Sequence, residues 1–226
     1  MNNQDFEINN IVDKLYSFKN FSGGPNEKYS EVSFATFYTL CICGMEPKSK
    51  LLDIGCGALR IGFLLMNYLE KEKYFGVEPN IAMLEEGKEK LAGEIISTKK
   101  PNFSNDENFN FKDEFKGIEF DFALARSIFT HTSKEQMKLC LAELSKVMKQ
   151  DGYFLLTFVP PKGILKSEYK GSKWLGRSHK SDKQGMAYYK KETIIRLAEE
   201  HGFVESKNIS NKILTANQEW LVLQKT

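Results

Sequence analysis

The chain has few of the residues from which metal sites and disulfide frameworks are built. Its 226 residues include four cysteines, at positions 41, 43, 56 and 140, and only three histidines. No two cysteines have the C-x-x-C spacing of a zinc site, so we expect no bound metal. Four reduced thiols fit a reducing compartment.

Long apolar runs and a basic leader are also missing. The first ten residues, MNNQDFEINN, are polar and acidic, unlike a secretory signal. The longest mostly apolar stretch, 34–45, is too short and too interrupted by threonine to span a bilayer. We therefore expect a cytoplasmic protein that does not bind membranes.

The remaining composition is that of one globular domain. Hydrophobic residues make up 41% of the chain, and its formal charge is +2. This length suffices for a complete α/β core, and a nearly neutral chain gives little support for nucleic-acid binding.

Alternating strand and helix patterns begin near residue 51. Apolar runs predict strands at 51–54, 73–77, 120–125 and 153–158, with a less regular one near 95–104, where Pro101 marks an edge or a break. Helical spacing predicts helices at 59–71, 81–91, 137–148 and 192–201, the second capped by Asn80. Strands at 203–209 and 219–224 follow. Two further helices, at 5–19 and 28–43, precede the core and are joined by a loop at 21–26. The alternation implies a parallel sheet covered on both faces.

The stretch LLDIGCGALRIG, residues 51–62, is a strand that runs into a glycine turn and then a helix. Glycine lets the backbone approach a ligand closely, and the start of the helix offers unpaired N–H groups. A nucleotide-like ligand fits such a turn. The dinucleotide fingerprint would be G-x-G-x-x-G, but Arg60 stands at the third glycine position, which argues against NAD.

With Glu78 ending the second strand, this stretch resembles motif I of the class I S-adenosylmethionine-dependent methyltransferases of the bacterial small-molecule type. The resemblance extends from about residue 50 to 152. It implies a Rossmann-like, doubly wound, seven-stranded and mostly parallel sheet whose last two strands form an antiparallel hairpin. It divides the single domain into an N-terminal helical cap (1–46), a cofactor-binding core (47–158), a basic substrate lid after strand five (159–191), and a C-terminal helix with edge strands (192–226).

The resemblance also assigns the cofactor-binding residues. Glu78 should accept hydrogen bonds from both ribose hydroxyls of S-adenosyl-L-methionine, whose product is S-adenosyl-L-homocysteine. Asp53 should order the glycine turn or reach the amino group of the methionine part; Arg60 contacts the methionine carboxylate or lies along the start of a helix. Asp106 should accept from the adenine amino group, or belongs to an ordinary polar turn. The full expected set is Asp53, Gly55, Cys56, Gly57, Arg60, Glu78, Pro79, Asp106, Ala125 and Arg126.

The segment after the fourth strand reads ARSIFTH, residues 125–131. By the resemblance, its backbone at Ala125 and Arg126 holds the methionine end. Enzymes that methylate nucleobase or glutamine amino groups carry Asn or Asp and two prolines there, which this chain lacks. His131 is the first candidate for a general base and His179 the second, because histidine titrates near neutral pH. A packing role for His131 is the alternative.

Positive charge is concentrated in residues 159–191, which hold nine Lys or Arg and two acids, a net +7, so the rest of the chain carries −5. This segment is either a lid over an anionic acceptor or a solvated lysine-rich loop. As acceptor-binding residues we expect Lys173, Trp174, Arg177 and Tyr188.

These features predict a monomeric or homodimeric enzyme that methylates a small, anionic metabolite or sugar, phosphorylated or nucleotide-linked, at a hydroxyl oxygen. A role in tailoring small molecules or cell-surface polysaccharide would fit. Two alternatives stay open: an RNA or protein methyltransferase, and a catalytically silent subunit that binds the cofactor and regulates a partner.

Overall fold

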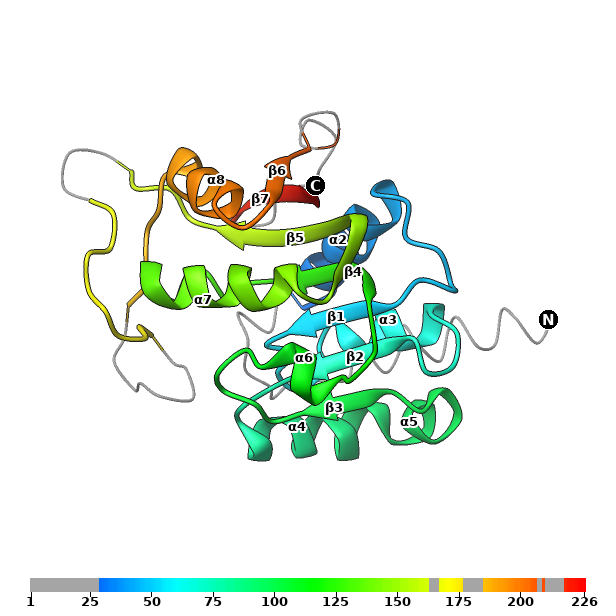
Figure 1. The fold of residues 1–226 in the computed structure, drawn as a ribbon. Coiled ribbons are helices and arrows are strands. Elements are labelled where there is room, and N and C mark those ends of the chain that lie inside the picture. Colours follow the sequence, from blue (N-terminus) through cyan, green and yellow to red (C-terminus); the bar gives the residue numbers. More distant parts are fainter. Residues whose placement is uncertain (1–28, 163–166, 177–184, 207–208, 210–217) are drawn as a thin grey trace.

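A computed structural model describes residues 29–162, 167–176, 185–206, 209 and 218–226. Its core is a seven-stranded sheet in the order β3-β2-β1-β4-β5-β7-β6 (Figure 1). The first five strands pair in parallel, and β7 runs antiparallel to both β5 and β6. The predicted Rossmann-like sheet is confirmed, including its antiparallel edge. The strands are β1 Leu51–Ile54, β2 Tyr74–Val77, β3 Asn102–Ser104, β4 Phe120–Ala125, β5 Met148–Phe158, β6 Phe203–Glu205 and β7 Glu219–Lys225.

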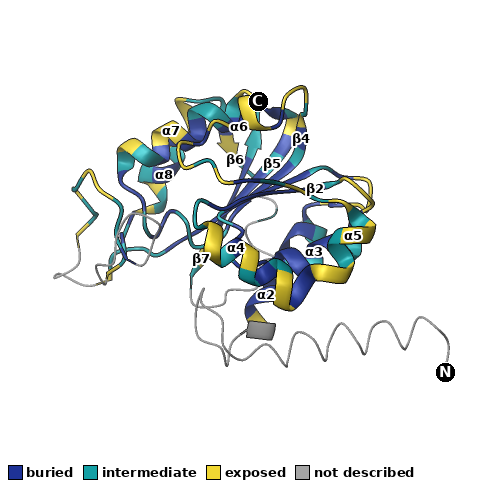
Figure 2. Ribbon diagram, turned by 90° about the horizontal axis from the view of Figure 1, so that it is seen from below, coloured by how far each residue is buried: buried dark blue, intermediate teal, exposed yellow. Residues whose placement is uncertain are grey.

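Helices cover both faces of the sheet. One face packs against α6, α7 and α8, whose buried side chains share a core cluster with Leu52 and Ile54. The other packs against α2, α3 and α4, together with η2 and α5, around Leu51 (Figure 2). The helices are α2 Tyr29–Ile42, α3 Gly62–Tyr68, α4 Ile81–Gly87, the π-helix η2 Lys88–Ala92, α5 Gly93–Lys99, α6 Phe111–Glu114, α7 Lys134–Ser145 and α8 Lys191–Glu199. Alternate residues of β1 thus face opposite layers, as a strand buried on both sides requires.

Local capping explains several helix ends. The Asn80 side chain accepts a hydrogen bond from the Met83 N–H at 3.1 Å, which confirms the predicted cap of α4. Ser133 and Gln136 form a reciprocal capping box at the start of α7. Helix α5 ends with Lys100 in the left-handed conformation, immediately before Pro101.

Some predicted boundaries were wrong. Residues 95–99 are helical, so the strand expected near 95–104 is limited to Asn102–Ser104. The pair Ile95 and Ile96 packs against the core from a helix, and an apolar pair alone does not distinguish helix from strand. Strand β5 begins at Met148, so the expected helix at 137–148 ends earlier, at Ser145. The expected helix at 5–19 and loop at 21–26 lie outside the described residues.

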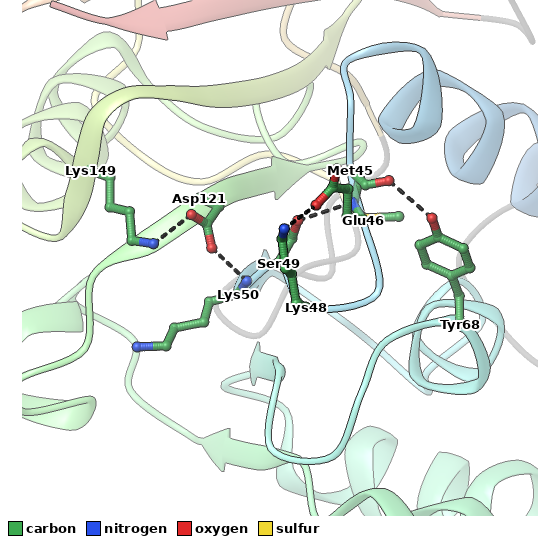
Figure 3. Close-up of polar contacts among 8 residues, drawn as sticks. All are labelled: Met45, Glu46, Lys48, Ser49, Lys50, Tyr68, Asp121 and Lys149. Carbon is green, nitrogen blue, oxygen red and sulfur yellow. Dashed lines mark hydrogen bonds and ion pairs between the residues drawn. The ribbon is translucent and has the colours of Figure 1, made fainter.

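The amino ends of the central strands are tied together by polar contacts (Figure 3). Asp121 accepts a hydrogen bond from the Lys50 N–H at 2.8 Å and pairs with Lys149 at 2.6 Å, which joins β1, β4 and β5. Nearby, the Tyr68 hydroxyl donates to the Met45 carbonyl at 3.0 Å. In an open parallel sheet the opposite, carboxyl ends of the strands bind ligands.

In the part of the chain that the structure describes, no helix is both long enough and apolar enough to cross a membrane.

Candidate cofactor and acceptor site

A glycine turn with a left-handed backbone follows β1. Gly55 and Gly57 have φ angles of 71° and 56°, which residues with a side chain rarely adopt. A Cβ atom on Gly55 would lie 2.1 Å from the Ile128 side chain, so this position has no room for one. The N–H groups of Gly55 and Cys56 both donate to the Val77 carbonyl, at 2.8 and 3.1 Å. The turn is therefore fixed against the end of β2.

Glu78 lies at that end of β2, beside the turn. One carboxylate oxygen accepts from the Gly57 N–H at 2.9 Å and the other from the Asn80 N–H at 2.8 Å. The side chain is buried, and burial raises its pKa while the two N–H groups lower it. A carboxylate can accept about four hydrogen bonds, so about two positions remain for a ligand that offers paired hydroxyls. Pro79, which has no N–H, lies between Glu78 and its second donor.

Asp53 lies on β1, two residues before Gly55, and is 3% exposed. Its carboxylate accepts a hydrogen bond of 2.6 Å from the Tyr74 hydroxyl. Burial raises the pKa of Asp53 to about 7; the Tyr74 hydrogen bond acts against this shift, and the charge of Glu78 adds to it. Tyr74 was missed by sequence reasoning, because its contact depends on the register of β1 and β2.

Two arginines lie close to the same strand ends. Arg60 is buried, with 6% of its surface exposed, and Arg126 is half-buried just beyond β4. Burial and the nearby charge of Arg60 lower the pKa of Arg126 to about 10. A carboxylate placed between two guanidinium groups is attracted by both charges, so the pair suits a carboxylate.

The turn after β4 is held by residues from two distant segments. Ser127 has a φ of 62°, in the left-handed region, and its N–H donates to the Thr157 hydroxyl at 2.7 Å. The Gln218 side chain receives a hydrogen bond from Thr157 and donates to the Ser127 hydroxyl at 2.9 Å. Strained residues of this kind gather at functional sites. No sequence pattern pointed to Thr157 or Gln218, since they meet Ser127 only in the folded sheet.

His131 connects this turn to the described part of segment 159–191. Its Nδ1 lies 3.1 Å from the Leu175 carbonyl, and its own carbonyl accepts from the Leu175 N–H at 2.8 Å. A carbonyl only accepts, so Nδ1 carries the proton, and in the neutral ring Nε2 has a free lone pair. Burial lowers the pKa of His131, so the neutral form dominates at pH 7.

The described residues of segment 159–191 run along the carboxyl edge of the sheet, where the parallel strands have their carboxyl ends. The N–H of Ala187 donates to the Thr130 carbonyl at 2.7 Å, and the Tyr189 hydroxyl donates to the Thr132 carbonyl at 2.8 Å. Trp174 packs on Phe109 beyond β3, with ring centres 6.2 Å apart. Of the expected acceptor-binding residues, Lys173 is exposed and Trp174 and Tyr188 are half-buried. Arg177 and the second base candidate, His179, lie outside the described residues.

Both carboxylate oxygens of Asp106 accept hydrogen bonds from residues close to it in the chain. One oxygen accepts from the Asn108 and Asn110 N–H groups at 3.0 and 2.8 Å, and the other from the Asn110 side chain at 2.8 Å. These contacts order the loop after β3. The adenine role of Asp106 stays a prediction.

Cys56 in the glycine turn and Ala125 at the end of β4 are both buried. Burial raises the pKa of Cys56 well above its usual value, so it is an unreactive thiol that packs on Gly76. Within the described ranges, no three His, Cys, Asp or Glu side chains lie together as a metal site requires.

Comparison with known proteins agrees with this geometry. Residues 52–154, from β1 into β5, match the family model described as a methyltransferase domain. Magnesium protoporphyrin IX methyltransferase from Synechocystis, solved with bound S-adenosylhomocysteine, has a TM-score of 0.65 and 14% identity, covering 98% of this chain and 97% of that one. A methyltransferase from Clostridium acetobutylicum (TM-score 0.62, 14% identity) covers 99% of each chain. The sugar N-methyltransferase from Streptoalloteichus (TM-score 0.60, 14% identity) covers 92% of this chain and 95% of its own.

The glycine turn, the acid ending β2 and the seven-stranded sheet define a nucleotide-type cofactor site on a methyltransferase fold. Residues 52–154 thus match a methyltransferase domain, and the sheet has the fold of S-adenosylmethionine-dependent methyltransferases. The Synechocystis enzyme has been solved with S-adenosylhomocysteine and also with S-adenosylmethionine bound.

Proposed function

We propose that this protein is an S-adenosylmethionine-dependent methyltransferase that acts on a hydroxyl of a small anionic metabolite or sugar, phosphorylated or nucleotide-linked. The observation that carries this proposal is the basic segment 159–191, whose described residues are hydrogen-bonded along the carboxyl edge of the sheet, next to His131. An acceptor held there would meet positive charge.

The charges of this segment favour an anionic ligand. Glu168 is engaged by Lys134 at 2.9 Å and by the Lys190 N–H at 2.9 Å, so its negative charge is already compensated. Lys170 and Lys173 are exposed and pair with no acid among the described residues. Unpaired lysines at the edge of a site attract anionic substrates and raise their association rate.

The cofactor roles follow from the contacts above. Glu78 would take the ribose hydroxyls with its remaining lone pairs, and Asp53 would receive the α-ammonium of the methionine part. Arg60 and Arg126 together would take the methionine carboxylate, while the backbone at Ala125 would border the methionine chain. When bound, the cofactor supplies a methyl group on a sulfonium, already activated for displacement.

The contribution of the protein is to position the acceptor and to remove one proton. Nε2 of His131 would take the proton that the acceptor hydroxyl releases as it receives the methyl group. The Nδ1 hydrogen bond to Leu175 fixes the ring in the tautomer that this step needs. Trp174 and Tyr188 would offer apolar surface to a base or sugar ring.

Labelled cofactor tests this function directly. The protein is incubated with methyl-labelled S-adenosylmethionine and size-fractionated cell extract, part of which has been treated with phosphatase. We expect label in small molecules that bind an anion exchanger, and less label after phosphatase treatment. Label in RNA or protein would overturn the proposal, and no label despite cofactor binding would favour a silent regulatory subunit.

The lysines can then be tested with the labelled fraction as acceptor. Changing Lys170 and Lys173 to Gln should raise the acceptor KM and leave the cofactor KM unchanged. The matched control changes Lys71 and Lys116, which precede β2 and β4 at the opposite edge of the sheet. Equal effects on both substrates, or equal effects of both variant pairs, would contradict a lid that binds anions.

A further inference from the structure

Tyr74 is a polar residue in the core of the cofactor site with no role assigned so far. It is 2% exposed and lies on β2 opposite Leu51 of β1. Alternate residues of a strand share a face, so Tyr74 lies on the same face as Asp53, one diagonal step away. Its hydroxyl reaches the Asp53 carboxylate at 2.6 Å.

Two glycines leave the space for this contact. A Cβ on Gly62, in α3, would lie 2.5 Å from the Tyr74 hydroxyl, so a larger residue would displace that group. Gly76 is the direct β2 partner of Asp53, and a Cβ there would lie 2.9 Å from the Cys56 sulfur. The local sequence thus leaves room both for the hydroxyl and for the turn above it.

Two groups act on the Asp53 carboxylate: the Tyr74 hydroxyl from β2 and the charge of Glu78, which follows β2. Burial and Asp53 together raise the pKa of Tyr74 well above its usual value, so the hydroxyl keeps its proton and always donates. Among the residues that the structure describes, the Tyr74 hydroxyl favours the charged form of Asp53, whereas burial and the charge of Glu78 oppose that form.

We propose that Tyr74 is a positioning residue of the cofactor site: its hydroxyl holds the Asp53 carboxylate charged and oriented to receive the α-ammonium of S-adenosylmethionine. This role rests on the binding role proposed for Asp53. Without the hydroxyl, Asp53 would be protonated over more of the neutral range, and a protonated acid is a weaker partner for an ammonium group.

The effect has a pH signature. Because Tyr74 lowers the pKa of Asp53, its loss should move that pKa upward from about 7 by about one unit, as expected for one hydrogen bond to a charged group. Below both values, the variant should bind the cofactor about tenfold more weakly. Above both values, wild type and variant should bind equally.

The test compares Tyr74→Phe with wild type by titration calorimetry, using S-adenosylhomocysteine from pH 5.5 to 9. The ratio of the two dissociation constants cancels the titration of the ligand's own amino group. We expect this ratio to be large at pH 5.5 and to approach one at pH 9. A ratio that is the same at every pH, whether one or larger, would overturn the positioning role, since lost packing has no such pH dependence.

Control variants separate the two roles. Asp53→Asn should weaken binding, and adding Tyr74→Phe to it should have no further effect; unchanged binding by Asp53→Asn would instead refute the role of Asp53 itself. Tyr68→Phe removes a comparable hydroxyl bond, to the Met45 carbonyl at the far edge (Figure 3), and should leave the ratio at one. Gly62→Ala displaces the hydroxyl without changing Tyr74 and should reproduce the pH-dependent ratio if Tyr74→Phe does not fold.

Discussion

Replacing Glu78 by Gln is the perturbation whose outcome the geometry constrains most tightly. The side chain keeps its size, but only one of its two terminal atoms can still accept. In either orientation the amide NH₂ faces the N–H of Gly57 or of Asn80, which are now 2.9 and 2.8 Å from carboxylate oxygens. One buried N–H loses its acceptor, which should lower the free energy of unfolding by about 1–3 kcal/mol.

The substitution should also weaken cofactor binding, independently of its effect on stability. The amide can no longer offer two oxygen atoms to the two ribose hydroxyls, and the charge that strengthens these bonds is gone. A hydrogen bond to a charged group contributes about 1.5–3 kcal/mol, so the Kd for S-adenosylhomocysteine should rise about 10- to 100-fold. Titration calorimetry gives the Kd, and urea unfolding gives the stability.

The control is Glu119→Gln, an exposed acid just before β4, which should change neither quantity. A Glu78→Gln variant with unchanged Kd would refute the ribose role, even if its stability fell as expected.

Four further predictions can be tested. His131→Asn can still donate to the Leu175 carbonyl but lacks the Nε2 base, so kcat should fall about 10²- to 10⁴-fold with an unchanged cofactor Kd; retained kcat would leave His131 only a structural role. In wild type the acid limb of kcat should lie below the ordinary histidine pKa, because burial lowers it. The folded-state pKa of Asp53, about 7, exceeds its unfolded value, so the ligand-free protein should lose a few kcal/mol of stability as pH rises from about 4 to 7. Urea unfolding at each pH measures this loss, and Asp53→Asn should remove most of it. Gly87→Ala would place a Cβ 2.4 Å from the Ala58 backbone, so its Tm should drop by several degrees, as for overpacking of about 1–3 kcal/mol; an unchanged Tm would contradict the close packing of α4 on the turn.

The central strands were predictable because their signals are local. The runs at 51–54 and 120–125 are almost entirely apolar, and the structure places β1 and β4 at these same residues. Strand β3 has only three residues and no periodicity to detect. The single-turn helix α6 and the early start of β5, where the β4–β5 register shifts, likewise depend on tertiary contacts.

Part of the site, like part of the fold, could be predicted from the sequence, and part could not. The spacing between the glycine turn and Glu78 could be read from the sequence, since both features end adjacent strands. The contacts that complete the site join residues far apart in the chain, as Gln218 joins Ser127 and as His131 joins Leu175. Such pairs are set by strand order and loop path, which a single sequence does not encode locally.

The most direct test of the account is a crystal structure of the protein with S-adenosylhomocysteine. We predict the ribose hydroxyls on the Glu78 carboxylate, the α-ammonium on Asp53, and the methionine carboxylate between Arg60 and Arg126. A ligand bound away from Glu78 and the glycine turn, or with its methionine end directed away from Asp53, would contradict the account.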